Sequence, residues 1–160
     1  MNKIAIFLAA LLASVVFVGC GDDNEQYKPD GPIDLIWTSQ TLKVEKDPGT
    51  WDTFVVPAEG GTYTLTTNNK HNPIVEAVFE GSDFTKKNED YKRYFVEETE
   101  GATVHHIKTP NIEVNIDQQT MTVTIQPNTT GKDRYFNIAT TIPVMYIGYA
   151  MFRQKGEILK

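Results

Sequence analysis

The chain has little cysteine and little serine. Cys20 is its one cysteine, and a single thiol excludes an internal disulfide framework and any zinc site built from several thiolates. Beyond the amino terminus the serines are Ser39 and Ser82, and neither lies in a nucleophile motif. The sequence also lacks a phosphate loop and the G-x-S-x-G and H-E-x-x-H patterns. We therefore expect a protein that is not an enzyme and that needs no cofactor.

Positive charge is also in deficit. The chain carries 15 basic and 21 acidic residues among 160, a formal net charge of −6. Removing residues 1–19 would take away Lys3 and leave 14 basic against 21 acidic residues, a charge of −7. A domain of that sign does not attract phosphate backbones, so we expect no nucleic acid partner. A length of 160 residues with 40% hydrophobic content suits one folded domain.

Histidines and carboxylates give no clear metal or catalytic site. His105 and His106 are adjacent, and neighbouring side chains of a strand point to opposite faces, so the two cannot chelate one metal together. One of them with His71 or a distant carboxylate remains an alternative, but an edge or surface histidine is the stronger interpretation. The carboxylates of residues 97–100 resemble a solvated strand end more than a glycosidase pair. No metal is expected.

The amino terminus has a short positive leader followed by an apolar run. Residues 4–18 are apolar except for Ser14, and these 15 residues are fewer than the ~20 that a bilayer-spanning helix needs. The pattern predicts a secretory signal over residues 1–19. The alternatives are a short membrane anchor or a buried helix.

The sequence FVGC, residues 17–20, resembles the lipobox of bacterial lipoproteins. The resemblance implies cleavage before Cys20 and acyl chains on its thiol and on the new amino terminus. A single short acyl chain binds only marginally, but several would hold the protein firmly on outer-membrane lipid. The following CGDDNE resembles the signal of surface-exposed lipoproteins of the Bacteroidetes, which implies the cell surface. Residues 20–32, with two prolines, are predicted to form an extended tether.

Beyond the tether the hydrophobic pattern alternates mostly with a period of two. A four-residue polar segment at 117–120 has hairpin length. Residues 82–95 differ, because their aromatic spacing of seven and four suits a short helix, or else a polar loop. The pattern predicts an all-β protein with two sheets packed face to face. Candidate strands span residues 35–44, 53–56, 62–67, 74–79, 94–97, 112–116, 121–125, 134–140 and 146–154.

Three segments resemble BACON domains, which are immunoglobulin-like sandwiches common in Bacteroidetes. Residues 56–69 resemble the opening of the domain, residues 128–138 a late turn, and residues 146–156 the last strand. The middle, residues 70–120, departs from the family pattern. The resemblance implies an immunoglobulin-like antiparallel β-sandwich over residues 33–160. It also implies binding of glycan or mucin, or a spacer role.

Aromatic rings are the candidates for sugar binding, because flat rings pack against the apolar faces of sugars. Trp51 follows turn residues and is expected at the surface. Trp37 belongs to the first candidate strand, and for each tryptophan a place in the core is the alternative. If the face of the last strand that carries Phe152 points inward, Tyr149 is exposed. The candidate ligand-binding residues are therefore Trp51, Trp37 and Tyr149.

These features together favour a lipid-anchored surface protein with a non-catalytic binding domain. Its expected partners are outer-membrane lipid, through acylated Cys20, and a glycan or protein ligand. The alternative is a structural or accessory lipoprotein that docks onto an outer-membrane protein complex by its sheet edges or loops.

Overall fold

The computed structural model describes residues 35–46, 52–82, 91–142 and 146–156. The chain divides into two units, residues 1–32 and 33–160, and every described residue belongs to the second. The predictions for the signal segment, for Cys20 and for Trp51 lie outside the described residues.

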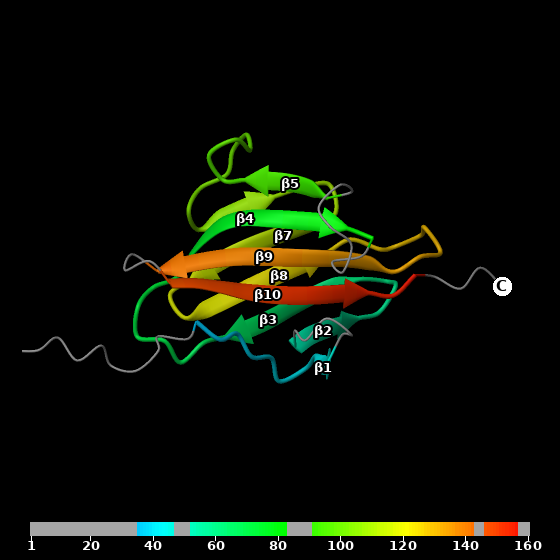
Figure 1. The fold of residues 1–160 in the computed structure, drawn as a ribbon, viewed down its shortest axis with the longest axis horizontal. Coiled ribbons are helices and arrows are strands. Elements are labelled where there is room, and N and C mark those ends of the chain that lie inside the picture. The colour runs from blue at the N-terminus through cyan, green and yellow to red at the C-terminus, as the bar shows by residue number, and fades with distance from the viewer. Residues whose placement is uncertain (1–34, 47–51, 83–90, 143–145, 157–160) are drawn as a thin grey trace, which may run out of the picture. The chain divides into compact units, whose positions relative to one another are not determined.

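The described residues form ten strands and no helix (Figure 1). Their sequences are rich in threonine, valine, isoleucine and aromatic residues, which favour a pleated, half-buried surface. The strands are β1 (Lys43–Lys46), β2 (Asp52–Val56), β3 (Gly61–Thr66), β4 (Ile74–Gly81), β5 (Lys92–Phe95), β6 (His106–Lys108), β7 (Ile112–Asp117), β8 (Thr120–Ile125), β9 (Arg134–Ile142) and β10 (Tyr146–Gln154).

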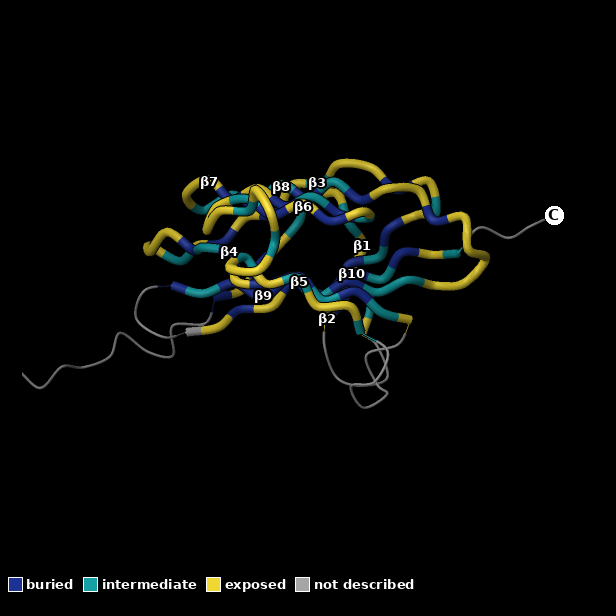
Figure 2. The backbone as a smooth tube through the Cα atoms, turned by 90° about the horizontal axis from the view of Figure 1, so that it is seen from above, coloured by how far each residue is buried: buried dark blue, intermediate teal, exposed yellow. Residues whose placement is uncertain are grey.

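The strands build two sheets. One has six strands in the order β1-β2-β10-β9-β4-β5, and the other has four in the order β3-β8-β7-β6. Neighbouring strands are antiparallel, except that β2 and β10 run parallel. Figure 2 shows the sheets as two layers. The prediction of an all-β, immunoglobulin-like sandwich is therefore confirmed.

Inward side chains from both sheets form one hydrophobic core. On β10 the inward set alternates with outward residues, and Phe152 packs against Phe54 of β2 with ring centroids 5.3 Å apart. Full burial of such a side chain contributes about 1.5–3 kcal/mol relative to exposure. The largest fully buried apolar side chains are Phe136, Phe152, Leu65, Ile107, Ile112, Met121, Ile125, Ile138 and Ile142.

Gly60 makes the turn into β3 possible. Its φ is +71°, a left-handed conformation that glycine adopts without a steric penalty. Its N–H donates to the carbonyl oxygen of Pro57 at 3.1 Å. A Cβ at this position would lie 2.2 Å from the carbonyl oxygen of Ile125, so no larger residue fits without a backbone shift. The glycine at this turn therefore has a structural role.

Two buried amides hold the loops at the same end of the sandwich. The Gln154 side chain is fully buried and its Nε2 donates to the carbonyl oxygens of Gln126 at 2.9 Å and Ala58 at 3.2 Å. The Asn128 amide donates to the carbonyl oxygens of Lys132 at 2.8 Å and Lys155 at 3.1 Å. These two side chains thus join the turn before β3, the loop before β9 and the end of β10.

Three expected elements differ from the structure. A continuous strand over residues 35–44 is wrong, because only Thr38 pairs, with Thr66, before the chain bends. At the bend, Ser39 Oγ accepts the N–H groups of Thr41 and Leu42, each at 3.3 Å.

The helix considered for residues 82–95 is wrong for its last part, which forms β5, while residues 83–90 lie outside the described residues. The expected strand at residues 94–97 is also shifted. The chain turns after Phe95, whose carbonyl oxygen accepts the Glu98 N–H at 3.1 Å and the Thr99 hydroxyl at 2.7 Å.

Candidate binding face

The outer surface of the four-stranded sheet is polar. Strands β3 and β8 place threonines opposite each other, and the hydroxyls of one pair lie 3.0 Å apart. Next to them, Glu113 of β7 contacts Lys108 at 2.9 Å and His106 at 3.1 Å. This alternation of apolar inside and polar outside is typical of a sheet with one solvated face. The threonine pairs are Thr62–Thr124, Thr64–Thr122 and Thr66–Thr120.

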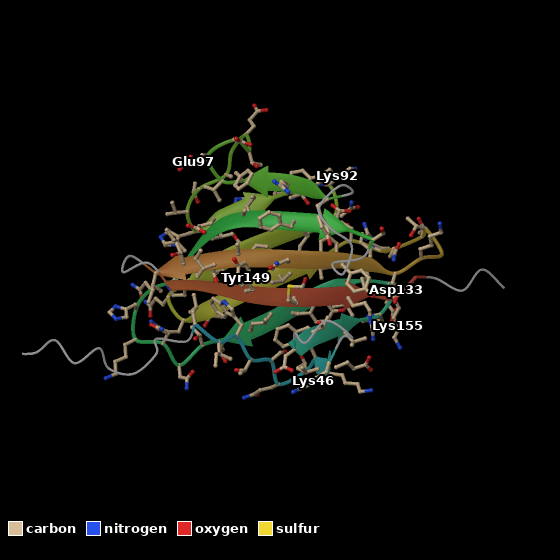
Figure 3. The ribbon with its side chains drawn as sticks, in the orientation of Figure 1. Lys46, Lys92, Glu97, Asp133, Tyr149 and Lys155 are labelled. Atoms are coloured by element: carbon tan, nitrogen blue, oxygen red, sulfur yellow. The ribbon has the colours of Figure 1, made fainter. Side chains whose placement is uncertain are left out.

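The centre of the outer surface of the six-stranded sheet is apolar instead. It holds a row of four side chains on four adjacent strands. The strand registers place Phe95, Ala77, Ala139 and Tyr149 side by side. Phe95 and Tyr149 are 39% and 43% exposed, whereas the two alanines between them are buried. Figure 3 shows the position of Tyr149 on this face. We call this set the aromatic row.

A second row lies beside the aromatic row. On each of the same four strands its member is two residues away from the member of the aromatic row. It consists of Arg93, Phe79, Asn137 and Met151. The Phe79 ring meets the Phe95 ring edge to face at a centroid distance of 6.1 Å, which joins the two rows. The Oδ1 atom of Asn137 is buried and has no hydrogen-bond partner. We call this set the polar row.

The charges of this face lie at its two edges. At the β1 edge, Arg153 donates from Nη2 to Glu45 Oε2 across β2, and Lys43 lies 2.8 Å from Glu45 Oε1. The hydrogen bond from Lys43, and then that from Arg153, lowers the pKa of Glu45 below its ordinary value. At the β5 edge, Arg93 is exposed and makes no ion pair with any described residue.

Of the predicted ligand-binding residues, Tyr149 lies on the aromatic row and is exposed as its place on β10 indicated. Trp37 is a correction: it is 5% exposed and its indole N–H donates to Thr140 Oγ1 at 3.0 Å. Trp37 therefore belongs to the core and offers no ring to a ligand. Trp51 and Cys20 lie outside the described residues.

Sequence reasoning missed the rest of the face, namely Phe95, Phe79, Asn137 and Arg93. The available signal was the lack of alternation in β4, where Ala77 and Phe79 point outward while Val75 and Val78 point inward. A strand that is apolar on both faces indicates a second buried or binding surface.

The described stretches contain no group of three or more histidine, cysteine, aspartate or glutamate side chains placed to hold a metal ion. Nor does any helix in the same stretches have the length and apolar character needed to cross a membrane.

These features define an immunoglobulin-like β-sandwich with one polar and one aromatic outer face. No family model matches the chain, and no curated protein sequence matches it. Its structure is similar to that of a protein from Bacteroides thetaiotaomicron solved by NMR, with a TM-score of 0.54 and 21% sequence identity. The similarity covers 81% of this chain and 93% of that chain. At this identity the similarity shows the fold alone.

Proposed function

We propose that the protein is a lipid-anchored bacterial surface protein whose BACON-like sandwich binds glycan, without catalysis, on the outer face of its six-stranded sheet. The observation that carries this proposal is the aromatic row. Two exposed rings, Phe95 and Tyr149, flank two small buried residues on one flat sheet face. A contiguous apolar patch on a protein surface marks a ligand-binding groove or an interface with another protein.

The dimensions of the aromatic row suit a chain of sugar rings. Neighbouring strands lie about 4.8 Å apart, so the backbones that carry Phe95 and Tyr149 are roughly 14 Å apart. Ala77 and Ala139 have small side chains, so the surface between the two rings lies below the level of the rings. A sugar can pack its apolar face on either ring while its hydroxyls reach polar groups of the neighbouring polar row.

A glycan array tests the proposal. The mature chain with Cys20→Ser, which cannot be acylated, is screened, and affinity for the best ligand is then measured by calorimetry. We expect Tyr149→Ala and Phe95→Ala each to weaken binding by about tenfold, a loss of ~1.4 kcal/mol. Thr122→Ala, on the outer face of the other sheet, is the control and should bind as the parent does. An empty array, or ligand binding that survives both ring deletions, would contradict the proposal.

The membrane anchor needs a separate experiment. The proposal predicts that a clickable fatty acid labels the protein in cells and that Cys20→Ala abolishes both the label and sedimentation with the outer membrane. Loss of the protein when intact cells are treated with protease would support the outward orientation. Labelling that persists in Cys20→Ala would show that another site carries the lipid.

A second candidate function is docking onto an outer-membrane protein complex. Ile147 favours it, because this aliphatic residue lies two positions before Tyr149 on the same face and is exposed. Sugars pack on flat aromatic rings and not on aliphatic side chains, whereas protein interfaces bury aliphatic side chains. A photo-crosslinking residue at position 147 would then capture one outer-membrane protein in intact cells, and the glycan array would stay empty.

A further inference from the structure

Arg93 gives the candidate binding face a positive charge at the edge of its rings. It pairs directly with Phe79 across β4 and β5 and stands two residues from Phe95, so all three side chains share the outer face. Its side chain is exposed and makes no ion pair with any described residue. On an acidic chain, this guanidinium is available to an anionic ligand.

Asn137 offers a hydrogen-bond acceptor on the other side of the same ring. It is the partner of Phe79 on β9. Its Oδ1 atom is buried without a hydrogen-bond partner, which costs about 1–3 kcal/mol. Because the atom is buried, a ligand hydroxyl reaches it only when the Asn137 amide turns toward the surface, and the hydrogen bond then recovers that free energy. The polar row therefore presents a cation, an aromatic ring and an acceptor on three adjacent strands.

Building on the proposed function, we infer that the glycan bound at this face contains a carboxylated sugar. Its ring packs on Phe79, its carboxylate pairs with Arg93, and a hydroxyl donates to Asn137 Oδ1. The fork of a guanidinium matches a carboxylate with two parallel hydrogen bonds. With strands ~4.8 Å apart, the backbones of Arg93 and Asn137 are separated by roughly 10 Å, which leaves room for one sugar ring between the two side chains.

Calorimetry on the mature chain with Cys20→Ser tests the inference. The first probe is trigalacturonate, compared with its methyl ester, which keeps the rings and hydroxyls and removes the charge. The second probe is sialyllactose, compared with lactose, so that a plant-type uronate and an animal-type sialic acid are distinguished as sources. We expect the charged member of at least one pair to bind about tenfold more tightly than its neutral match, an advantage that falls as salt is raised.

Variants at two neighbouring positions locate the effect. Arg93→Met should weaken binding of the acid by about tenfold and leave binding of the ester unchanged. Lys92→Met is the matched control, since Lys92 is the adjacent residue of β5, pairs with Glu80 and points to the opposite face of the strand. It removes the same charge and should leave the affinity unchanged.

Each outcome decides the inference. Equal affinity for acid and ester in both pairs, or no binding of either acid, overturns it, as does an Arg93→Met variant that weakens acid and ester alike. The proposed function is judged separately, by whether any glycan binds in a manner that Tyr149→Ala weakens. A neutral glycan that meets this condition would keep the proposed function and reject the carboxylated ligand.

Discussion

The indole N–H of Trp37 donates a hydrogen bond to Oγ1 of Thr140 at 3.0 Å, across 103 residues of sequence. The same hydroxyl donates to the carbonyl oxygen of Gly148 at 3.0 Å. One buried hydroxyl thus connects the segment before β1 to both β9 and β10. A Cβ on Gly148 would lie 2.5 Å from the carbonyl oxygen of Leu35, so the first segment also packs closely against β10.

Thr140→Val keeps the shape of this side chain and removes its hydroxyl. We expect unfolding to become easier by about 1–3 kcal/mol, because the buried indole N–H of Trp37 loses its acceptor. Urea denaturation followed by circular dichroism measures the change. Thr141→Val, on the outer face of the same strand, should stay within about 0.5 kcal/mol of the parent. Equal effects of the two substitutions would argue against a structural role for the Trp37 hydrogen bond.

Alanine substitutions at Gly60 and Gly101 distinguish the cost of a left-handed backbone conformation from the cost of a steric clash. Their φ values are +71° and +72°, but a Cβ on Gly101 would meet nothing within 4 Å. Gly101→Ala should therefore cost only the left-handed conformation, about 1–2 kcal/mol. Gly60→Ala must also displace backbone around Ile125, which adds about 1–3 kcal/mol. Thermal unfolding of the two variants should differ accordingly, and similar melting temperatures would contradict the close approach at Gly60.

The lowered pKa of Glu113 makes part of the stability of the folded protein depend on pH in the acidic range. The hydrogen bond from Lys108, and then that from His106, lowers its pKa below the ordinary value of 4.5. A lowered carboxylate pKa stabilises the folded state at pH values above the unfolded pKa, and this stabilisation is lost as pH falls through the folded pKa.

Glu113→Gln should therefore be less stable than the parent at neutral pH and should approach it as the pH falls below 4.5 and through the lowered pKa of the folded state. The difference should stay below about 1 kcal/mol, because solvent screens the pair. Urea titrations at several pH values give the comparison. Asp117→Asn, which removes a carboxylate of the same strand that has no ion pair among the described residues, is the control. If Glu113→Gln behaved like this control, the ion pairs would not contribute to stability.

A substitution in the hairpin between β7 and β8 should stabilise the folded protein. Gln118 has a φ of 51°, a left-handed conformation that is unfavourable for a residue with a side chain. Gln118→Gly should raise the free energy of unfolding by up to about 1 kcal/mol, despite the added freedom of the unfolded chain. Gln119→Gly, where φ is not positive, should lower it by about 0.5–1 kcal/mol. Chemical denaturation distinguishes the two, and the opposite order would contradict the turn geometry.

Regular alternation made most of the fold predictable from the sequence. Strands β7 and β8 were expected because every second residue is apolar and the connection is polar and short. Strand β6 was not expected, because its three residues include one buried side chain, Ile107, and show no period. The expected strand at residues 35–44 failed because the side chain of Ser39 bonds the following backbone in place of a neighbouring strand.

The candidate site was less predictable, because it depends on which strands are neighbours and in what register. Tyr149 could be placed from its position on β10 alone. Its row partners could not, since β4 and β9 shift by one residue at the bulge between Val75 and Ala77. That shift sets Ala77 opposite Ala139, and no local pattern in the sequence reports it. Trp37 was ambiguous, because a large ring fits a core and a ligand site equally well.

The position of β10 has a consequence for how the molecule is made. The last of the described strands lies inside the six-stranded sheet, between β2 and β9, and not at an edge. Until that strand is in place, β2 and β1 have no sheet to join, because β2 pairs with β10 from the opposite end of the folded part of the chain. A chain still emerging from a ribosome or a translocation channel must therefore remain incompletely folded, and a truncation that removes β10 would leave β2 and β1 without their neighbour in the sheet.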